Sequence, residues 1–402
     1  MWLILKGDVM GLNGFQKYEF QSLCSLSKKK YNPNNSLERY QCYELEHLSQ
    51  ETGRIIGSVD SKEQSSIKNV FSDQDVLFGK LRPYLKKYAL PSTDGVCSTE
   101  IWVLVPKTEV CSRRYLFALI QSEKFVRCAS IASGSKMPRA DWNYISTQVF
   151  EVPQILEQEM IADILGACDE AIEAQERLIT QKQERQKGLM QKLLVGEVRF
   201  PKFDRTPWEE LKLGSVLKHV FRPISWSPEM SLKLVSIRRR AGGLFLRPEM
   251  KGSDYKTSDL HEIRKGDFLI SKRQVTHGAL AVVKTPFDGC HVSKEYTIFE
   301  NTAPKVLHTP YLDWLSKTRE MWHKAYVASN GVAIEKLIFV PKDFLKFEIK
   351  LPPTIEEQRR IASFLNEQEQ EIVLSRKRLE VLKLQKKSLM QKLLTGEVRV
   401  KV

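Results

Sequence analysis

The stretch Leu-Met-Gln-Lys-Leu-Leu-Val-Gly-Glu-Val-Arg at residues 189–199 recurs as Leu-Met-Gln-Lys-Leu-Leu-Thr-Gly-Glu-Val-Arg at residues 389–399. The two copies are identical at ten of eleven positions, and the match runs backward without a gap to Pro153 and Pro353 at a constant spacing of 200 residues. Self-similarity at a fixed spacing indicates a duplicated architecture. The sequence therefore predicts a fixed segment, 151–200, that is repeated as 351–402.

Each fixed segment has the pattern of a long helix with defined ends. In the second copy a coiled-coil seam recurs in steps of four and three residues. A Thr354-x-x-Glu357 capping box precedes the helix, and Gly396 lies where a helix end favours a left-handed residue. The seam consists of Ile361, Leu365, Gln368, Ile372, Ser375, Leu379, Leu382, Lys386, Leu389 and Leu393.

The two helices are predicted to pack on each other in opposite directions. The seam of the first copy is more polar, with Gln175, Lys182 and Gln186, so we do not expect that helix to stand alone. A helix of ~42 residues is about 63 Å long at ~1.5 Å per residue. One compact domain joins the end of the first helix to the start of the second only if both points lie at the same end of the pair. We therefore expect antiparallel helices that separate two domains related by a pseudo-twofold axis.

The regions before each helix resemble each other more faintly. Asp75 corresponds to Asp267 at a spacing of 192 residues, and Tyr115 corresponds to Tyr311 at 196, so insertions are tolerated here. Each region reads as mixed α/β: strands at 75–78 and 101–105 and a helix from 115 to about 127, with equivalents at 267–270, 296–299 and 311–325. The predicted fold class is α+β, comprising an N-terminal segment 1–17, domains 18–150 and 201–350, and antiparallel coiled-coil spacer helices 151–200 and 351–402.

Charge and duplication together point to DNA. The chain carries 63 Lys and Arg against 49 Asp and Glu, a net charge of +14, which favours a polyanionic partner. Two similar but divergent domains on a spacer match a ligand that repeats along its length, and duplex DNA repeats every ~34–36 Å. Divergence between the domains predicts two different half-sites and hence a bipartite, asymmetric target. The net charge alone fits equally a basic protein that does not bind DNA.

Basic clusters recur at corresponding places in both domains. Lys and Arg neutralise phosphates, whereas Arg and Gln also address base edges in the major groove. Any single cluster also fits a solvated charged face, and Arg82 also fits a structural ion pair. The predicted DNA-binding residues are Lys28, Lys29, Lys30, Lys80, Arg82, Tyr84, Lys86, Lys87, Lys136 and Arg139 in the first domain, and Arg222, Arg238, Arg239, Arg240, Lys272, Arg273 and Gln274 in the second.

The sequence predicts no catalytic or metal site. It contains no phosphate-binding loop and no Gly-rich dinucleotide fingerprint. The seven cysteines form no C-x-x-C pair, which argues against a zinc finger or a disulfide framework and favours a reducing cytoplasm. No apolar run is long enough for a signal peptide or a membrane span. Two alternatives remain: a nuclease that uses Asp343, Glu348 and Lys350, and a coiled-coil scaffold that binds only proteins.

The repeated segments 152–162 with 189–199 and 351–362 with 389–399 resemble those of the DNA-specificity subunit of Type I restriction-modification systems. The string Asp-Val-Leu-Phe-Gly-Lys-Leu-Arg-Pro-Tyr-Leu at 75–85 and the string Gly-Ser-Lys-Met-Pro-Arg at 134–139 are also typical of its target-recognition domains. The chain departs from the family at residues 1–17 and in the second domain, which has Arg-Gln-Val-Thr at 273–276 and Asn-Gly-Val-Ala at 330–333 in place of these strings.

The resemblance implies a division of labour. Each domain would read one half of a split DNA sequence, while the helices would set the gap and dock two methyltransferase subunits, to which restriction subunits can be added. S-adenosylmethionine, and ATP with Mg²⁺ for restriction, would bind to those partners, and this chain would hold no cofactor. The predicted spacer and docking residues are Ile161, Leu165, Ile172, Leu189, Leu193, Ile361, Leu365, Ile372, Leu379, Leu382, Leu389 and Leu393.

Overall fold

The computed structural model describes residues 14–131, 137–203, 206–255, 259–333 and 336–401. The chain forms two compact units, the first from Met1–Arg177 with Arg376–Val402 and the second from Leu178–Ser375. The division cuts both long helices, α5 (Ile155–Val195) and α9 (Ile355–Leu394). Each unit therefore combines one variable domain with the first half of the helix that follows it and the second half of the other helix.

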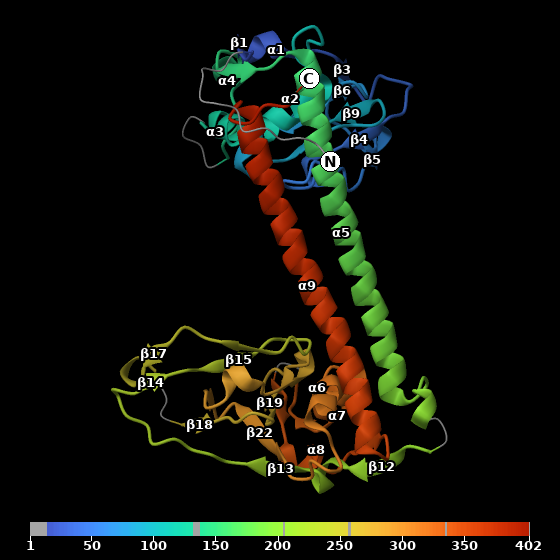
Figure 1. The fold of residues 1–402 in the computed structure, drawn as a ribbon, viewed down its shortest axis with the longest axis vertical. Helices are drawn as coiled ribbons and strands as arrows, with labels where there is room; N and C mark the ends of the chain where they lie inside the picture. Colours follow the sequence, from blue (N-terminus) through green and yellow to red (C-terminus); the bar gives the residue numbers. More distant parts are fainter. Residues whose placement is uncertain (1–13, 132–136, 204–205, 256–258, 334–335, 402) are drawn as a thin grey trace. The chain divides into compact units, whose positions relative to one another are not determined.

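The first unit is built on two sheets. A four-stranded sheet has the order β2-β10-β7-β8, a five-stranded sheet has the order β3-β6-β9-β4-β5, and β1 pairs with β11. Residues of the short helices α2 and α3 pack against β7 and β10 of the four-stranded sheet, and the strands of the five-stranded sheet are labelled in Figure 1. The elements are β1 Gln16–Glu19, α1 Phe20–Leu23, β2 Cys24–Leu26, β3 Lys30–Tyr31, β4 Gln41–Tyr43, β5 Val59–Asp60, β6 Lys68–Phe71, β7 Val76–Gly79, β8 Tyr88–Ala89, β9 Gly95–Cys97, β10 Ile101–Pro106, α2 Arg113–Gln121, α3 Glu123–Ser130, α4 Trp142–Ser146 and β11 Val149–Val152.

The second unit repeats this plan with smaller accessory sheets. Its four-stranded sheet has the order β13-β22-β19-β20, and β12 pairs with β25. Two-stranded pairs β14-β17, β15-β16, β18-β21 and β23-β24 complete it. The elements are β12 Glu209–Lys212, β13 Leu217–Val220, β14 Ser231–Leu232, β15 Val235–Ile237, β16 Leu244–Leu246, β17 Met250–Lys251, β18 Leu260–Glu262, β19 Phe268–Ser271, β20 Leu280–Val282, β21 His291–Ser293, β22 Tyr296–Asn301, α6 Thr309–Leu315, α7 Arg319–Val327, β23 Ser329–Asn330, β24 Ile338–Phe339, α8 Pro341–Phe344 and β25 Glu348–Leu351.

The central strands confirm the predicted correspondence, but each predicted helix is wrong in one respect. Strands β7 and β10 occupy the predicted places in the first domain, and β19 and β22 occupy them in the second. Each expected single helix is instead two helices, α2 with α3 and α6 with α7. The chain breaks at Ser122 and Thr318, whose hydroxyls accept bonds from the amides of Phe125 and Met321 and so begin the second helix.

Within each unit the halves of α5 and α9 run antiparallel, as predicted. In the first unit Lys386 of α9 pairs with Asp169 of α5 at 2.6 Å. In the second unit Gln186 of α5 donates to Glu369 of α9 at 2.9 Å, and Lys182 pairs with Glu371 at 3.0 Å. Lys182 and Gln186, two of the polar seam positions of α5, therefore face carboxylates of α9, which explains how these polar positions pack in the seam.

The ends of the helices follow the prediction except at one residue. Gly196 and Gly396 have φ angles of 77° and 74°, the left-handed conformation expected after a helix. The amide of Glu357 is capped by the hydroxyl of Thr354 at 3.3 Å. The carboxylate of Glu357 does not complete the predicted capping box, because it accepts two bonds of 2.8 Å from the guanidinium of Arg199.

Each unit has a main core in which the domain and the two helix halves share residues. In the first, Tyr115 and Phe125 pack with Ile161 and Leu393. In the second, Tyr311 and Met321 join Leu193, Ile361 and Leu365 in the same way. Helix ends and domains are therefore parts of one hydrophobic core rather than separate modules. In the described part of the chain, no helix has the length and apolarity to cross a membrane.

Candidate nucleic-acid interface

Three segments of the first domain meet beyond the end of β7. The amide of Lys80 donates to the carbonyl of Glu100 at 2.9 Å, and the amide of Ala140 donates to the carbonyl of Lys80 at 2.9 Å. The amide of Arg82 donates to the carbonyl of Pro138 at 2.7 Å. These backbone bonds join the loop after β7, the turn before β10 and the described end of the Gly134–Arg139 loop into one surface. Lys136 lies outside the described residues.

The loop after β7 has strained backbone at two basic residues. Arg82 and Lys86 have φ angles of 51° and 50°, on either side of the 3-10 turn Pro83–Leu85. A left-handed conformation costs a residue with a side chain roughly 1–2 kcal/mol. Such strain persists where the surroundings hold it, and it is concentrated at functional positions. The turn carries the Tyr84 ring at 54% exposure, a large aromatic surface in a basic loop.

Several predicted DNA-binding residues of the first domain have partners within the protein. Lys86 pairs with Glu51 at 2.8 Å, Lys30 donates to Asn69 at 2.5 Å, and Lys87 donates to the carbonyl of Leu45. Five others form no side-chain hydrogen bond or ion pair within the described part of the chain, and these remain available to a ligand: Lys28, Lys29, Lys80, Arg82 and Tyr84.

The second domain forms an equivalent surface from different segments. The amide of Lys272 donates to the carbonyl of Glu295 at 2.8 Å, as the amide of Lys80 does to the carbonyl of Glu100. The β15–β16 hairpin lies against the loop after β19, because the amide of Arg240 donates to the carbonyl of His277 at 2.7 Å. Arg239 donates to the side chain of Gln274 at 3.0 Å.

The side chains of three further predicted DNA-binding residues, Arg238, Arg240 and Lys272, differ in the number of bonds they form within the protein. Arg240 has a left-handed φ of 57° at the hairpin tip. The guanidinium of Arg238 donates to the carbonyl of Leu244 at 2.9 Å and lies over the Phe245 ring at 4.8 Å. The ammonium of Lys272 donates to the carbonyl of Lys294 at 2.6 Å. The side chain of Arg240 is exposed and forms no hydrogen bond or ion pair within the described residues, so it is the most accessible of the three.

Arg222 is committed to the fold of the second domain. Its guanidinium forms a bidentate pair with Asp267 at 2.5 and 3.0 Å, and its side chain is only 14% exposed. Asp267 also accepts the amide of Arg264, which closes the turn into β19. This geometry argues against the predicted DNA contact at Arg222, because its donors are already bound to a buried carboxylate.

Two acidic residues of this surface were not among the sequence-derived candidates. Arg139 donates from Nε to the Glu100 carboxylate at 3.0 and 3.2 Å, and Arg273 donates from Nε to Glu295 at 2.6 Å. Glu100 and Glu295 are 195 residues apart, between the spacings of 192 and 196 that relate Asp75 to Asp267 and Tyr115 to Tyr311. That spacing was the one sequence signal for this pair of glutamates. A single carboxylate near basic residues is too common to be selected from the sequence without knowledge of its partner.

The structure gives little support to the nuclease alternative within the described part of the chain. The carboxylate of Asp343, proposed for a nuclease, pairs with Lys346 at 2.7 Å. Among the described residues no group of three or more His, Cys, Asp or Glu side chains is placed to hold a metal. Burial raises the pKa of the Cys42 thiol to about 11 and that of Cys111 to about 12, so neither is a thiolate nucleophile at neutral pH.

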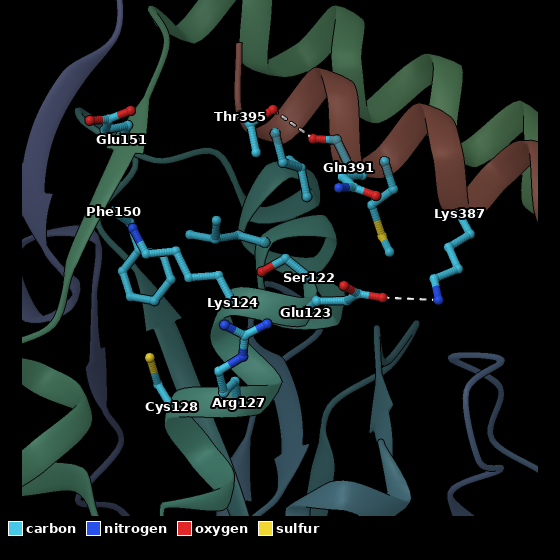
Figure 2. Close-up of a pocket in the computed structure, with 13 residues that line it drawn as sticks. Ser122, Glu123, Lys124, Arg127, Cys128, Phe150, Glu151, Lys387, Gln391 and Thr395 are labelled. Atoms are coloured by element: carbon cyan, nitrogen blue, oxygen red, sulfur yellow. Dashed lines mark hydrogen bonds and ion pairs between the residues drawn. The ribbon is translucent and has the colours of Figure 1, made fainter. Parts of the chain in front are cut away.

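A pocket of about 540 Å³ opens where the last turns of α9 meet α3 and β11 (Figure 2). At its mouth Glu123 pairs with Lys387 at 2.9 Å, and the Lys124 ammonium lies 5.0 Å from the centre of the Phe150 ring. A smaller pocket of about 210 Å³ has equivalent walls in the second unit, including Leu194 and Thr318. The recurrence shows that the pocket follows from the way a helix end packs on a domain.

The predicted docking residues on the helices are mostly part of the core. Ile161, Leu165, Ile361 and Leu365 are at most 4% exposed. Ile172, Ile372, Leu193 and Leu393 are buried too, and Leu189, Leu379, Leu382 and Leu389 are half-buried. The buried positions fit the spacer part of the prediction, because their side chains pack inside each unit, and docking of partner subunits on these helices stays a prediction. The buried residues stabilise the helix pair and its attachment to the domains.

Comparison with known proteins identifies the family. The family model described as "Type I restriction modification DNA specificity domain" matches residues 13–181 and again residues 207–384. A Methanocaldococcus jannaschii protein assigned as the MjaX specificity subunit of a type I restriction enzyme is 27% identical over 266 residues, which are 62% of this chain but only 59% of that protein.

Solved structures match almost the whole chain. The HsdS subunit from Thermoanaerobacter tengcongensis is 21% identical, with a TM-score of 0.55 over 96% of this chain and 97% of that one. A chain from a structure titled for complex assembly and conformational transition of the type I R-M system is 22% identical, with a TM-score of 0.65 over 96% and 98%. At these identities the likeness establishes the fold. With two family matches that together span most of its length, the chain belongs to the Type I restriction-modification DNA-specificity family.

Proposed function

We propose that this chain is the recognition subunit of a Type I restriction-modification complex and that each domain reads one half of a bipartite, asymmetric DNA target. One observation carries the proposal: the same strand-end surface occurs in both domains but presents different side chains. The loop after β7 offers Arg82 and Tyr84, whereas the loop after β19 offers Arg273 and Gln274. To read two different half-sites, the two domains need side chains of different chemistry at equivalent positions.

The reactions of such a complex would belong to its other subunits. Two methyltransferase subunits, joined by restriction subunits, would bind S-adenosylmethionine, and ATP with Mg²⁺ would serve restriction. This chain would hold no cofactor and catalyse no step, and it would act in the cytoplasm, where its DNA target is.

The test is to express the chain with the methyltransferase encoded beside it and to map methylated adenines across a genome by single-molecule sequencing. The expected result is one split motif with two unlike halves, which is absent when this chain is omitted. Methylation by the purified single chain, or a nuclease activity abolished by Glu348→Ala, would contradict the proposal. Loss of DNA binding as salt rises from 50 to 200 mM is also expected, because phosphate contacts release counterions.

A further inference from the structure

An arginine–glutamate pair recurs at the same corner of both domains, although the chain supplies the arginine differently. Glu100 precedes β10, and Glu295 precedes β22. The strand registers Ile101↔Gly79 and Tyr296↔Ser271 place both glutamates at equivalent positions. The guanidinium bound to Glu100 comes from Arg139, near the end of the domain. The one bound to Glu295 comes from Arg273, in the loop after β19.

In the described part of the chain, both guanidinium groups are held mainly through Nε, and Nη2 of each forms no hydrogen bond. In Arg139 the Nε atom donates to both oxygens of Glu100, and Nη1 makes one longer bond of 3.4 Å to the carbonyl of Met137. In Arg273 the Nε atom donates to Glu295 at 2.6 Å. The two side chains are 48% and 66% exposed. A guanidinium held through Nε presents its two terminal nitrogens as a fork, and that fork matches the O6 and N7 acceptors of guanine.

Stability alone does not account for the recurrence. Exposed ion pairs contribute about 0–1 kcal/mol, which is little reason for two domains to reach one arrangement from two chain positions. A phosphate contact can be made by any exposed cation, including Lys, and carries no sequence information, whereas an arginine held in a fixed orientation can also make a bidentate contact with a base edge. The surrounding side chains also suit base edges: Arg82 and Tyr84 are in the first domain, and Gln274 is in the second.

We propose that Arg139 and Arg273 each read a guanine in the major groove, one in each half-site, and that Glu100 and Glu295 are positioning residues that orient them. The inference rests on the proposed function, since it names the bases that the two domains recognise. It requires at least one G·C pair in each half of the target. It also requires that each arginine influence only the half read by its own domain.

The first experiment compares methylation motifs of the whole complex. Arg139→Lys and Arg273→Lys keep the charge but lose the fork. Matched controls are Arg114→Lys, an arginine with 46% exposure paired with Asp163, and Arg264→Lys, an arginine with 64% exposure paired with Glu262 before the other end of β19. With Arg139→Lys, one position that is G·C in the wild-type motif should accept other base pairs in one half-site. With Arg273→Lys, the same should occur at one position of the other half-site. Both controls should retain the wild-type motif.

The second experiment measures binding of the complex to duplexes in which 7-deazaguanine, which lacks N7, replaces the guanine at the relaxed position. Wild-type affinity should fall, by at most the roughly 5- to 150-fold that a whole bidentate contact is worth, because the analogue loses N7 but keeps O6. The Arg139→Ala complex should lose affinity for unmodified DNA and show no further loss with the analogue. The Glu100→Gln complex should lose less affinity with the analogue than the wild type does, but more than the Arg139→Ala complex does, because the arginine remains but is less firmly oriented.

The outcomes separate the inference from the function on which it rests. A split wild-type motif that both lysine variants leave unchanged would overturn the inference and leave the proposed function standing. Equal relaxation of both halves by either variant would also overturn it, since that result indicates a structural role. A wild-type complex without a split motif would overturn both.

Discussion

Single buried ion pairs join each helix end to the start of the other helix within a unit. Arg199 binds Glu357 in the second unit, and Arg399 binds Glu157 in the first at 2.6–2.7 Å. These are the same pair 200 residues apart. Glu357 and Glu157 are only 1% and 4% exposed at their side chains, so each carboxylate depends on its arginine.

Replacing Arg199 tests this dependence. Arg199→Ala strands a buried carboxylate and should lower the free energy of unfolding of the second unit by roughly 3–5 kcal/mol. The measurement is denaturant unfolding of the full chain in its complex, followed by hydrogen exchange to locate the loss. Lys202→Ala removes the neighbouring exposed pair with Glu356, at 3.6 Å, and should change stability by less than about 1 kcal/mol. Similar losses of unfolding free energy in the two variants would show that the burial of Glu357 does not determine the stability that Arg199 contributes.

At the scale of elements, one glutamine attaches each long helix to its domain. Gln358 accepts the amide of His308 at 2.8 Å and donates to the carbonyls of Val306 and Pro352 at 2.8 and 3.2 Å. Gln158 repeats these bonds with the amide of Ser112 and the carbonyls of Val110 and Pro153. Both glutamines are buried, and both lie in the repeated segment. The helix therefore sets the position of the loop that leads into α2 or α6.

We expect Gln358→Leu to destabilise the second unit although the side chain keeps a similar volume. The variant leaves buried backbone groups without partners, at about 1–3 kcal/mol each. Gln370→Leu, at an exposed position of the same helix, is the control and should be close to neutral. Thermal unfolding of both variants measures the difference. Equal melting temperatures would mean that water replaces the lost bonds and that the glutamine is dispensable.

At the scale of the whole molecule, the proposed function makes the helices the determinant of the gap between half-sites. Insertion or deletion within 165–185 and 365–385 should change the gap in the methylated motif without changing either half. Seven inserted residues in each helix keep the seam in register and lengthen the helix by about 10 Å. The mapped motif should therefore contain a longer gap.

An insertion between Asn34 and Asn35, in an exposed turn of the first domain, is the control for this experiment. It adds residues without lengthening either helix, and it should leave the gap as it is in the wild type. If the heptad insertions also leave the gap unchanged, the helices do not set the spacing. The measurement reads the gap directly from the sequence motif, so it does not depend on the affinity of the altered complex.

Much of this protein could be predicted from local patterns. The 200-residue repeat, the steps of four and three and the terminal glycines of α5 and α9 are periodic or local signals, and the antiparallel direction followed from chain length and connectivity. The strands β7, β10, β19 and β22 were also predicted, because short apolar runs determine them. The breaks at Ser122 and Thr318 were missed because a capping hydroxyl inside an apolar pattern is a weak signal.

The candidate site was predictable as a region but not as a set of contacts. Basic composition marked the loops after β7 and β19, but the fate of each charge depends on which carboxylate the fold brings beside it. Arg222 meets Asp267, 45 residues away, and becomes structural, whereas Arg139 meets Glu100, 39 residues away, and stays exposed. The duplication, the two long helices and the DNA-binding class could be predicted from the linear sequence, because they depend on periodicity and net charge. Which arginines stay exposed and which are buried in ion pairs depends on the fold, because ion pairing is set by distances between residues far apart in the chain.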